Sequence, residues 1–467
     1  MSDQRSTPDS SVDSDDSVSR RNYMRLTGLA GLGGVTALAG CSGDGGDGSD
    51  GTSSTDGNGD GSSDSTSDGS SDGGSGGNGE LEIIHHWTRG ADGKAFSAFL
   101  TEFKNQHSDV RILENTIAGQ AGSGVKTVIT QRLLNSEPPS TFQGLAGKYM
   151  TPFKQHLDPI GDSVWSSNGM KDAYLQGPKE IAQLDGSYMM VPLNIHRVNL
   201  LFYNKSVVEQ AGVDPTSLGS AGDLTSAMQK VENSTDAVGM AQSTMEPWTV
   251  LQLWETALLD EGGVEAYNKF ANGNVAAVEG PAKAALERIA AFKDHFSSDA
   301  NAIAWPEAAS QITEGNAAFF NNGDWAAGVF LGAEDFAFGE DWDWIPFPGT
   351  ENSFTVVMDV FAMPSNNPSP EATKKFLKFC GSKDGQRILN SIKGSIPPRT
   401  DVSTEEFSGY QKEQIESINN TDNQPGSMTH GMSVAPEPLT NLKKATGDFT
   451  SSWDVDATYD QFVSAFE

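Results

Sequence analysis

Residues 81–87 read LEIIHHW, a short and mostly apolar run that is typical of a buried β-strand. After this run, Phe96, Phe99 and Phe103 recur at helical spacing. Residues 110–113, VRIL, then read as a second strand. A strand, a helix and a strand in succession form the βαβ unit of parallel sheets. The stretch therefore predicts an α/β fold.

The same alternation continues along the chain and favours a parallel sheet. Residues 188–203 form a long apolar run that is broken by Pro192, so this run could leave one sheet and enter another. Residues 354–363 are β-rich and are the candidate for a second crossing. Further strand character lies at residues 141–143, and helices are predicted at residues 125–134, 249–259, 282–296, 306–313, 370–379 and 385–392.

Composition bounds the possible functions. The chain has 467 residues, 36% of them hydrophobic, and is long enough for two domains. Its 31 Lys and Arg stand against 63 Asp and Glu, and the net charge of −32 opposes nucleic-acid binding. Residues 80–467 alone hold 27 basic and 50 acidic residues, a net charge of −23, so we expect a halophilic source, where salt screens the self-repulsion.

The first 41 residues resemble an export signal. Arg20 and Arg21 precede an uncharged stretch, residues 26–40, which is too short and too weakly apolar for a permanent membrane helix. The arginine pair resembles the twin-arginine signal, and residues 38–41, LAGC, resemble a lipobox. We therefore expect Cys41 to carry a lipid anchor, so that it is neither a redox residue nor a core residue.

Residues 42–79 are predicted to be a disordered tether. They hold 14 Gly, 11 Ser and 8 Asp and no apolar side chain that could be buried, so they cannot fold alone. The folded part is expected to cover residues 80–467.

Tryptophans point to the chemistry of the folded part. Residues 80–467 contain no H-E-x-x-H, G-x-S-x-G or C-x-x-C signature of common enzymes. Several of the nine tryptophans lie beside polar residues, among them Trp87, Trp248 and Trp325. An indole face covers the apolar C–H face of a pyranose, while carboxylates and amides bind its hydroxyls, so this pattern favours a sugar ligand.

Several sequence blocks share their order and spacing with a known family. They are residues 138–139 PP with 142–143 FQ, 191–199 VPLNIHRVN, 203–205 YNK, 211–213 AGV, 323–326 GDWA, 393–401 KGSIPPRTD and 430–432 HGM. Over residues 80–435 the sequence resembles the family 1 extracellular solute-binding proteins, the sugar receptors of ABC importers, and among them the glucose- and mannose-binding proteins. It departs from that branch at His86, Asp92 and Leu145, where the branch usually has Trp, Glu and a polar residue.

The resemblance implies a two-lobed periplasmic-binding-protein-like fold of type II. The lobes would be hinge-linked, with the ligand in the cleft between them. Lobe 1 would hold about residues 80–193 and 358–400, and lobe 2 about residues 194–357 and 401–467.

The resemblance also implies a sugar site with contributions from both lobes. Trp87 would stack on the sugar ring, and Asp92 and Gln143 would bind its hydroxyls from lobe 1. The facing wall and edge would be built by Trp248, Asp324, Lys393 and His430, with His196 and Trp305 nearby. His196 could equally pack at the hinge, and Trp305 could simply begin a helix before Pro306.

The implied function is that of a receptor and not of an enzyme. The protein would bind a monosaccharide such as glucose or mannose, without cofactor or metal, and deliver it as a monomer to ABC permease subunits served by a cytoplasmic ATPase. It would be held at the cell surface, on the outer face of the cytoplasmic membrane, by the lipid anchor alone. An oligosaccharide or glycerol-phosphate receptor remains an alternative, as does a secreted carbohydrate-active hydrolase, although we can place no catalytic pair for the hydrolase.

Overall fold

The computed structural model describes residues 79–88, 90–117 and 123–467. The predicted export signal, with Cys41, lies outside these residues, and so does the predicted tether apart from Gly79. Export, lipidation and tethering therefore stay predictions.

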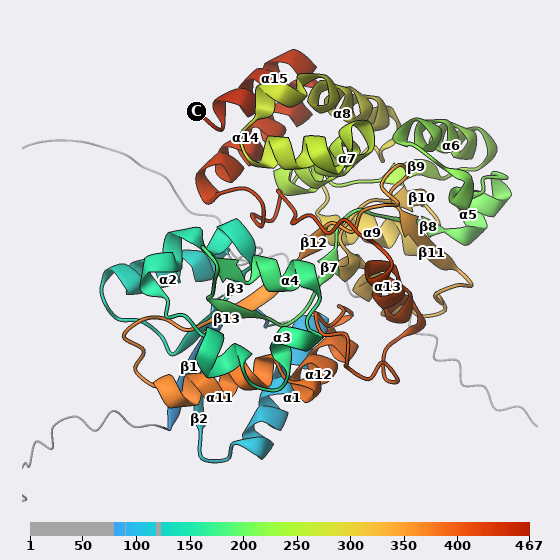
Figure 1. Cartoon of the computed structure of the whole chain (residues 1–467). Helices are drawn as coiled ribbons and strands as arrows, with labels where there is room; N and C mark the ends of the chain where they lie inside the picture. The colour runs from blue at the N-terminus through green and yellow to red at the C-terminus, as the bar shows by residue number, and fades with distance from the viewer. Residues whose placement is uncertain (1–78, 89, 118–122) are drawn as a thin grey trace, which may run out of the picture. The chain divides into compact units, whose positions relative to one another are not determined.

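The first sheet has the strand order β2-β1-β3-β13-β6 (Figure 1). Its strands are β1 (Glu80–His85), β2 (Arg111–Thr116), β3 (Thr141–Leu145), β6 (Met190–Pro192) and β13 (Asp359–Ala362). The first three are parallel, as expected, but β13 runs antiparallel to both of its neighbours. The predicted parallel sheet is therefore confirmed for β1, β2 and β3 but does not extend to β13. The first residue of β13 pairs with the last residue of β3, because the chain re-enters this sheet at the end where β3 leaves it.

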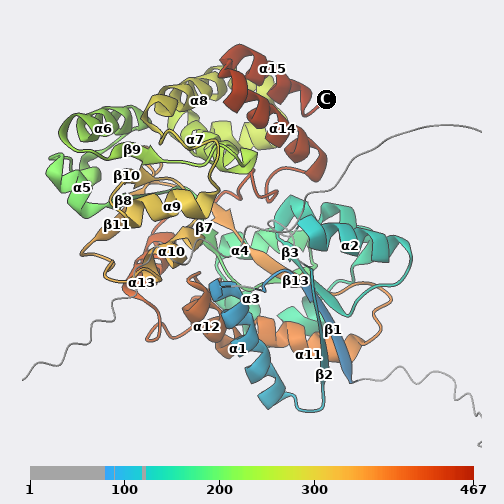
Figure 2. The ribbon, with the colours of Figure 1, turned by 180° about the vertical axis from the view of Figure 1, so that it is seen from behind.

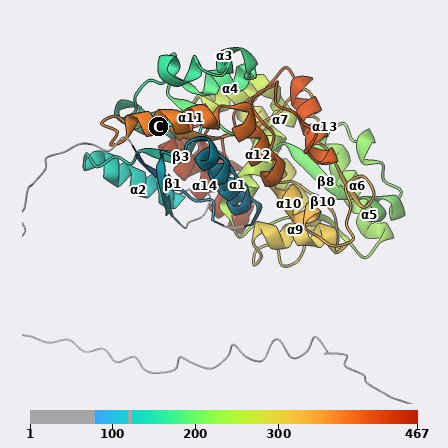
Figure 3. The ribbon, with the colours of Figure 1, turned by 90° about the horizontal axis from the view of Figure 1, so that it is seen from below.

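Helices cover this sheet and complete its core. The predicted helical spacing of Phe96, Phe99 and Phe103 is confirmed, since all three side chains are buried in α1 (Gly90–Gln106). Figure 3 shows α1 beside α12 (Lys383–Lys393). The remaining elements here are α2 (Ser123–Leu134), η3 (Gly147–His156), η4 (Gly161–Trp165), α3 (Met170–Ala173), α4 (Gln176–Ile181), β4 (Gln183–Leu184), β5 (Ser187–Tyr188) and α11 (Pro370–Cys380).

The second sheet has the order β11-β8-β10-β9 and a separate core. Strand β8 runs antiparallel to both of its neighbours, β10 and β11, whereas β9 and β10 pair in parallel. Its strands are β8 (Leu200–Asn204), β9 (Val238–Ala241), β10 (Ala317–Phe320) and β11 (Trp342–Pro346). The surrounding elements are α5 (Lys205–Gln210), η5 (Pro215–Ser217), α6 (Ala221–Ser234), α7 (Pro247–Ala271), η6 (Val275–Val278), α8 (Glu279–Phe292), η7 (Lys293–His295), α9 (Trp305–Thr313), η8 (Asp324–Ala326), α10 (Ala327–Leu331) and α13 (Gly409–Asn419).

Two C-terminal helices complete the second core. Figure 2 shows α14 (Pro436–Ser452) packed on α7, and α15 (Val455–Ser464) next to α8. The sequence analysis predicted no element here. The predicted helix at residues 249–259 lies in the first part of α7, which breaks at Gly263, where φ is 66°, before a second helical part ends at Ala271.

Two short strands lie where the chain passes between the sheets. The predicted crossings are confirmed: residues 188–203 divide into β6, β7 (His196–Arg197) and β8, and residues 354–363 into β12 (Val356–Val357) and β13. Strands β7 and β12 pair antiparallel with each other. Both crossings are thus bonded together at one place.

Arg197 reinforces this crossing pair. Its buried guanidinium donates to the Oδ1 of Asn199, to the Oγ of Ser417 and to the carbonyl of Ser353, each at 3.0 Å. Because a buried charge needs such partners, Arg197 fixes both crossings to α13. No helix within the described residues is long and apolar enough to cross a membrane.

Candidate functional site

Asp359 is the centre of a polar cluster at the crossing. It opens β13 and is buried, with 5% of its surface exposed. Its Oδ1 accepts a hydrogen bond from the Nε2 of Gln143 at 2.8 Å, and its Oδ2 accepts one from the Nδ2 of Asn194 at 2.8 Å. The Oδ1 of Asn194 in turn accepts the backbone N–H of Asp359 at 2.8 Å. The carboxylate is therefore held rigidly between residues of β3 and of the first crossing.

Lys393 brings a positive charge to this cluster. Its Nζ lies 2.6 Å from the Oδ1 of Asp92 and 4.0 Å from the Oδ2 of Asp359. Burial alone would lower the pKa of Lys393, but the two carboxylates raise it above its usual value. Burial alone would likewise raise the pKa of Asp92, but Lys393 holds it below its usual value. Asp92 and Lys393 therefore both stay ionised near neutral pH.

Trp87 lies against the same lysine. It follows β1 and is buried at 3% exposure, with the ring of Phe96 at 5.1 Å and that of Phe361 at 6.1 Å between centroids. The Nζ of Lys393 lies 5.0 Å from the centroid of the Trp87 ring. Trp87 is thus both a core residue of the first sheet and a neighbour of the charged cluster.

Asp324 and His196 form the second half of the site. Asp324 begins η8, just after β10, and is buried. It contacts the Nδ1 of His196, and its Oδ2 accepts the backbone N–H of Arg197 at 3.1 Å. The Nε2 of His196 lies 3.3 Å from the Nδ2 of Asn194. His196 therefore joins the Asp359 cluster to Asp324.

An aromatic group lies beside Asp324. The ring of Trp325 is 5.5 Å from that of His196, 5.2 Å from that of His430 and 6.3 Å from that of Trp248. The rings of Trp248 and His430 are 5.8 Å apart. Trp248, Trp325 and His430 are each only partly buried. Such ring faces can cover the apolar face of a ligand.

Trp305 lies at the edge of this group. Its backbone N–H donates to the Oε2 of Glu246 at 3.0 Å, and the Oε1 of the same carboxylate accepts from the Nε1 of Trp248 at 3.3 Å. Trp305 is also the first residue of α9, with Pro306 second. The reading of Trp305-Pro306 as a helix start is confirmed, and its contact with the aromatic group runs through Glu246.

Contacts thus link all nine predicted residues into one constellation. In the first half, Trp87 and Asp92 contact Lys393, which lies with Gln143 beside Asp359. The second half gathers around Trp325 and consists of His196, Asp324, Trp248 and His430, with Trp305 joined through Glu246. The constellation brings together carboxylate oxygens, an ammonium and indole rings, which is the chemistry that binds a polyol. The described residues contain no group of three His, Cys, Asp or Glu that could hold a metal ion.

The sequence analysis omitted Asp359, Asn194, Trp325 and Glu246 from the site. Asp359 had a detectable signal, because it is the single charged residue in the apolar run at residues 354–363. Trp325 follows directly after Asp324, which the analysis did assign. Glu246 carries no comparable signal, since its role depends on Trp305, which lies 59 positions later along the chain.

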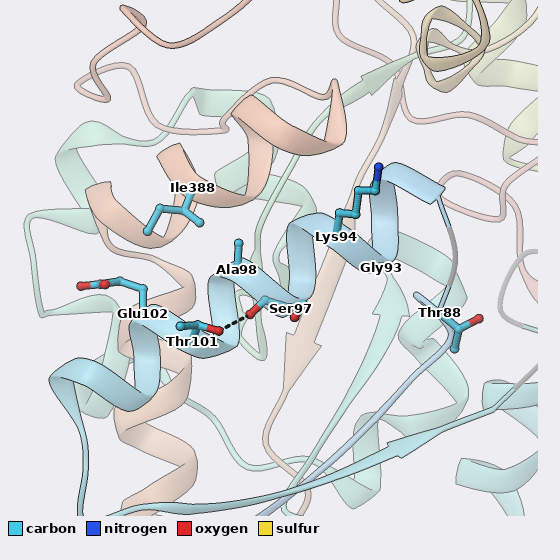
Figure 4. A pocket seen from close by; sticks show the side chains of 8 residues that line it. All are labelled: Thr88, Gly93, Lys94, Ser97, Ala98, Thr101, Glu102 and Ile388. Atoms are coloured by element: carbon cyan, nitrogen blue, oxygen red, sulfur yellow. Dashed lines mark hydrogen bonds between the residues drawn. The ribbon is translucent and has the colours of Figure 1, made fainter. Parts of the chain in front are cut away.

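A surface hollow of about 790 Å³ lies elsewhere, over α1 and α12 (Figure 4). None of the nine predicted residues lines it. Its lining consists of Thr88, Gly93, Lys94, Ser97, Ala98, Thr101, Glu102 and Ile388. The chemistry at the crossing, and not this hollow, marks the candidate site.

A comparison with protein families shows that residues 87–387 match the model of the bacterial extracellular solute-binding proteins. The chain belongs to this family. The family consists of substrate-binding receptors and not of enzymes. The matched range contains Trp87, Asp92, Gln143 and Asp324 but ends before Lys393 and His430.

Relatives of this solute-binding protein cover most of its length. The xylose/arabinose-binding protein XacG of Haloferax volcanii is 35% identical over 83% of this chain and 84% of its own length. An uncharacterized ABC transporter extracellular-binding protein of Pyrococcus horikoshii is 32% identical over 83% of this chain and 87% of its own.

Solved structures support the fold of the solute-binding protein. The solute receptor AcbH, described as having a preference for β-D-galactopyranose, superposes with a TM-score of 0.70 at 18% identity, over 83% of this chain and 98% of its own. The expected two-lobed periplasmic-binding-protein-like fold is thereby confirmed.

Proposed function

We propose that this protein is the substrate-binding lipoprotein of an ABC sugar importer and that it binds a monosaccharide between its two lobes. The observation that carries the proposal is the constellation around Asp359 and Trp325, to which both sheets contribute. Three carboxylates, of Asp92, Asp324 and Asp359, offer acceptors for sugar hydroxyls, and Lys393 offers a donor. The relatives named above and their sugar ligands support the same class of ligand.

We expect the ligand to be a small sugar. Micromolar binding corresponds to about −8 kcal/mol, which a stacked ring face and a handful of hydroxyl bonds can supply after the entropy of association is lost. Glucose and mannose are the ligands that the sequence analysis proposed. Because XacG is named for xylose and arabinose, pentoses belong in the same test.

We expect the two lobes to close about the crossing when the receptor binds its sugar. Contacts from both lobes exist together only when the lobes close on the ligand, so the ligand shifts the population toward the closed form. The paired strands β7 and β12 are the expected hinge. The closed form would then be recognised by the permease subunits, whose cytoplasmic ATPase drives transport.

Delivery to the cell surface completes the proposal. Twin-arginine export and a lipid on Cys41 would place the monomeric receptor on the outer face of the cytoplasmic membrane, at the end of the tether. The net charge of −32 supports a salt-rich surrounding medium.

The test is a titration of the purified residues 80–467 with glucose, mannose, galactose, xylose and arabinose, followed by intrinsic tryptophan fluorescence. We expect a saturable change with at least one of these sugars, which is recovered intact afterwards. Conversion of the sugar into a product would indicate an enzyme, and saturation only by oligosaccharides or glycerol phosphate would replace the monosaccharide.

A further inference from the structure

A buried carboxylate lies behind the loop that carries His430. Glu255 is on α7, seven residues after Trp248 and therefore on the same helix face, and only 1% of its surface is exposed. Its Oε1 accepts a hydrogen bond from the hydroxyl of Ser427 at 2.6 Å. Its Oε2 accepts the backbone N–H of Met428 at 2.7 Å and that of Thr429 at 3.1 Å.

The donors around Glu255 match an ionised carboxylate. The two backbone N–H groups can only donate, so Oε2 must be an acceptor, and the hydroxyl of Tyr267 adds a further contact at 3.1 Å. Burial raises the pKa of Glu255 above its usual value, and these hydrogen bonds limit that rise. Lys443 also faces this region, and its positive charge favours the ionised form of Glu255.

Ser427 connects Glu255 to His430 by hydrogen bonds. A hydroxyl group has one hydrogen and two acceptor positions. Ser427 gives its hydrogen to Glu255 and accepts the backbone N–H of His430 at 3.3 Å. Its remaining acceptor position faces the Nδ1 of His430 at 3.0 Å. That ring nitrogen must therefore carry a hydrogen.

We propose that Glu255, acting through Ser427, fixes His430 in the tautomer with hydrogen on Nδ1, so that Nε2 presents a bare lone pair to a ligand hydroxyl. The statement about a ligand hydroxyl rests on the proposed function. Among the described residues, the Nε2 of His430 has no hydrogen-bond partner, and the ring contacts those of Trp248 and Trp325. Glu255 and Ser427 are then positioning residues for the acceptor.

The neutrality of the ring supports the same conclusion. Burial, together with the charge of Lys443, lowers the pKa of His430 to about 3. The imidazole therefore stays neutral at physiological pH and does not turn into a double donor. At this position the site selects a substituent that can donate a hydrogen bond, so a hydroxyl binds and a fluorine or a methoxy group at the same carbon does not.

The direct test is nitrogen NMR of the ligand-free protein labelled with ¹⁵N-histidine, because the shift of each ring nitrogen reports whether it carries hydrogen. His430 is assigned by the signal that His430→Gln removes. We expect a protonated Nδ1 and a bare Nε2 in the parent protein. A protonated Nε2 with a bare Nδ1 would overturn the inference, whatever the protein binds.

Glu255→Gln should reverse the tautomer. The amide oxygen of the new side chain must accept the N–H groups of Met428 and Thr429, so its NH₂ group faces Ser427 and donates to it. The hydrogen of Ser427 then turns to the Nδ1 of His430, and Nε2 becomes the protonated nitrogen. We expect sugar binding about tenfold weaker, since a donor would then meet the ligand hydroxyl in place of an acceptor.

Glu232→Gln is the matched control, because Glu232 contacts a different histidine, His295, at 2.9 Å. It should change neither the His430 tautomer nor the sugar affinity. If Glu255→Gln does not fold, Ser427→Ala replaces it and should leave His430 as a mixture of tautomers. An unchanged tautomer in either folded variant would overturn the relay. If the parent protein shows the expected tautomer but binds no sugar, the proposed function and the role of His430 toward a ligand are both wrong. The relay from Glu255 to His430 then still stands.

Discussion

Lys393 and Asp92 form an ion pair of 2.6 Å between the last turn of α12 and the first turn of α1. Each charge lies at the helix end whose dipole favours it, since cations stabilise helix C-termini and anions stabilise N-termini. The lysine side chain is 5% exposed, whereas that of Asp92 is 42% exposed. The two partners should therefore respond differently to substitution.

Lys393→Met should lower the free energy of unfolding by about 3 kcal/mol, because it leaves the buried Asp359 without its cation. Asp92→Asn should cost less than about 1 kcal/mol, since its charge reaches solvent. Both variants should weaken sugar binding. Denaturant unfolding and calorimetry separate the two effects, and equal losses of stability would contradict the assignment of Asp359 as the buried partner.

Acid should destabilise the protein through His85. Burial lowers the pKa of this fully buried side chain to about 4, and the neighbouring His86 adds to that effect, although the exposed Glu114 lies 3.1 Å from its Nε2. The unfolded chain binds a proton at His85 below about pH 6.5, and the folded chain does not until about pH 4. Stability is therefore lost as the pH falls through this window, by about 2 kcal/mol between pH 7.5 and pH 5.

His85→Asn should remove most of this loss, since its Oδ1 can still accept the backbone N–H of Trp87, which now bonds to the Nδ1 of His85 at 3.2 Å. The measurement is denaturant unfolding of parent and variant at both pH values. If the variant loses as much stability between the two pH values as the parent does, groups other than His85 cause the loss.

Trp325→Ala should weaken sugar binding about tenfold, because its partly buried ring lies between His196 and Trp248 and is free to stack on a ligand. Trp305→Ala should change affinity little, since its contact with the site is made by its backbone. Trp87→Ala should cost about 3 kcal/mol of stability in addition to affinity, because the ring is part of the core. Fluorescence titrations and unfolding curves of the three variants test this order, and loss of binding in Trp305→Ala alone would reverse the assignment of the stacking face.

Export depends on residues outside the described structure. Replacement of Arg20 and Arg21 by Lys should block surface delivery. Cys41→Ala should release mature protein to the medium or leave an uncleaved precursor. Cell fractionation follows both, and normal surface delivery of the double lysine variant would exclude the twin-arginine route.

The sequence was most informative where local pattern and burial coincide. The apolar run at residues 188–203 correctly indicated a crossing, and Pro192, which has no N–H to donate, is the last residue of the edge strand β6. Strand direction was not accessible in this way: β13 is antiparallel because it pairs with β3, more than 200 residues earlier. The helices after residue 401 were missed, although Ser408 and Gln411 form a capping box at the start of α13.

The residues of the site were likewise predicted only in part. The family resemblance named nine residues that the structure brings together, but it did not name Asp359, whose carboxylate bonds Gln143 and Asn194 and lies 4.0 Å from Lys393. That role arises only when β13 returns to the first sheet. Glu255 was equally hidden, since its link to His430 depends on a loop 172 residues away along the chain.

The most direct test of the account is calorimetric titration of the parent protein, Asp359→Asn and Glu232→Gln with the five aldoses, with circular dichroism to show that all three are folded. We expect the parent and Glu232→Gln to bind one sugar molecule per chain with equal affinity, and Asp359→Asn to bind it at least tenfold more weakly, because its amide disrupts the acceptor shared by Gln143, Asn194 and Lys393. A folded parent that binds none of these sugars, or a folded Asp359→Asn variant that binds like the parent, would contradict the central claim.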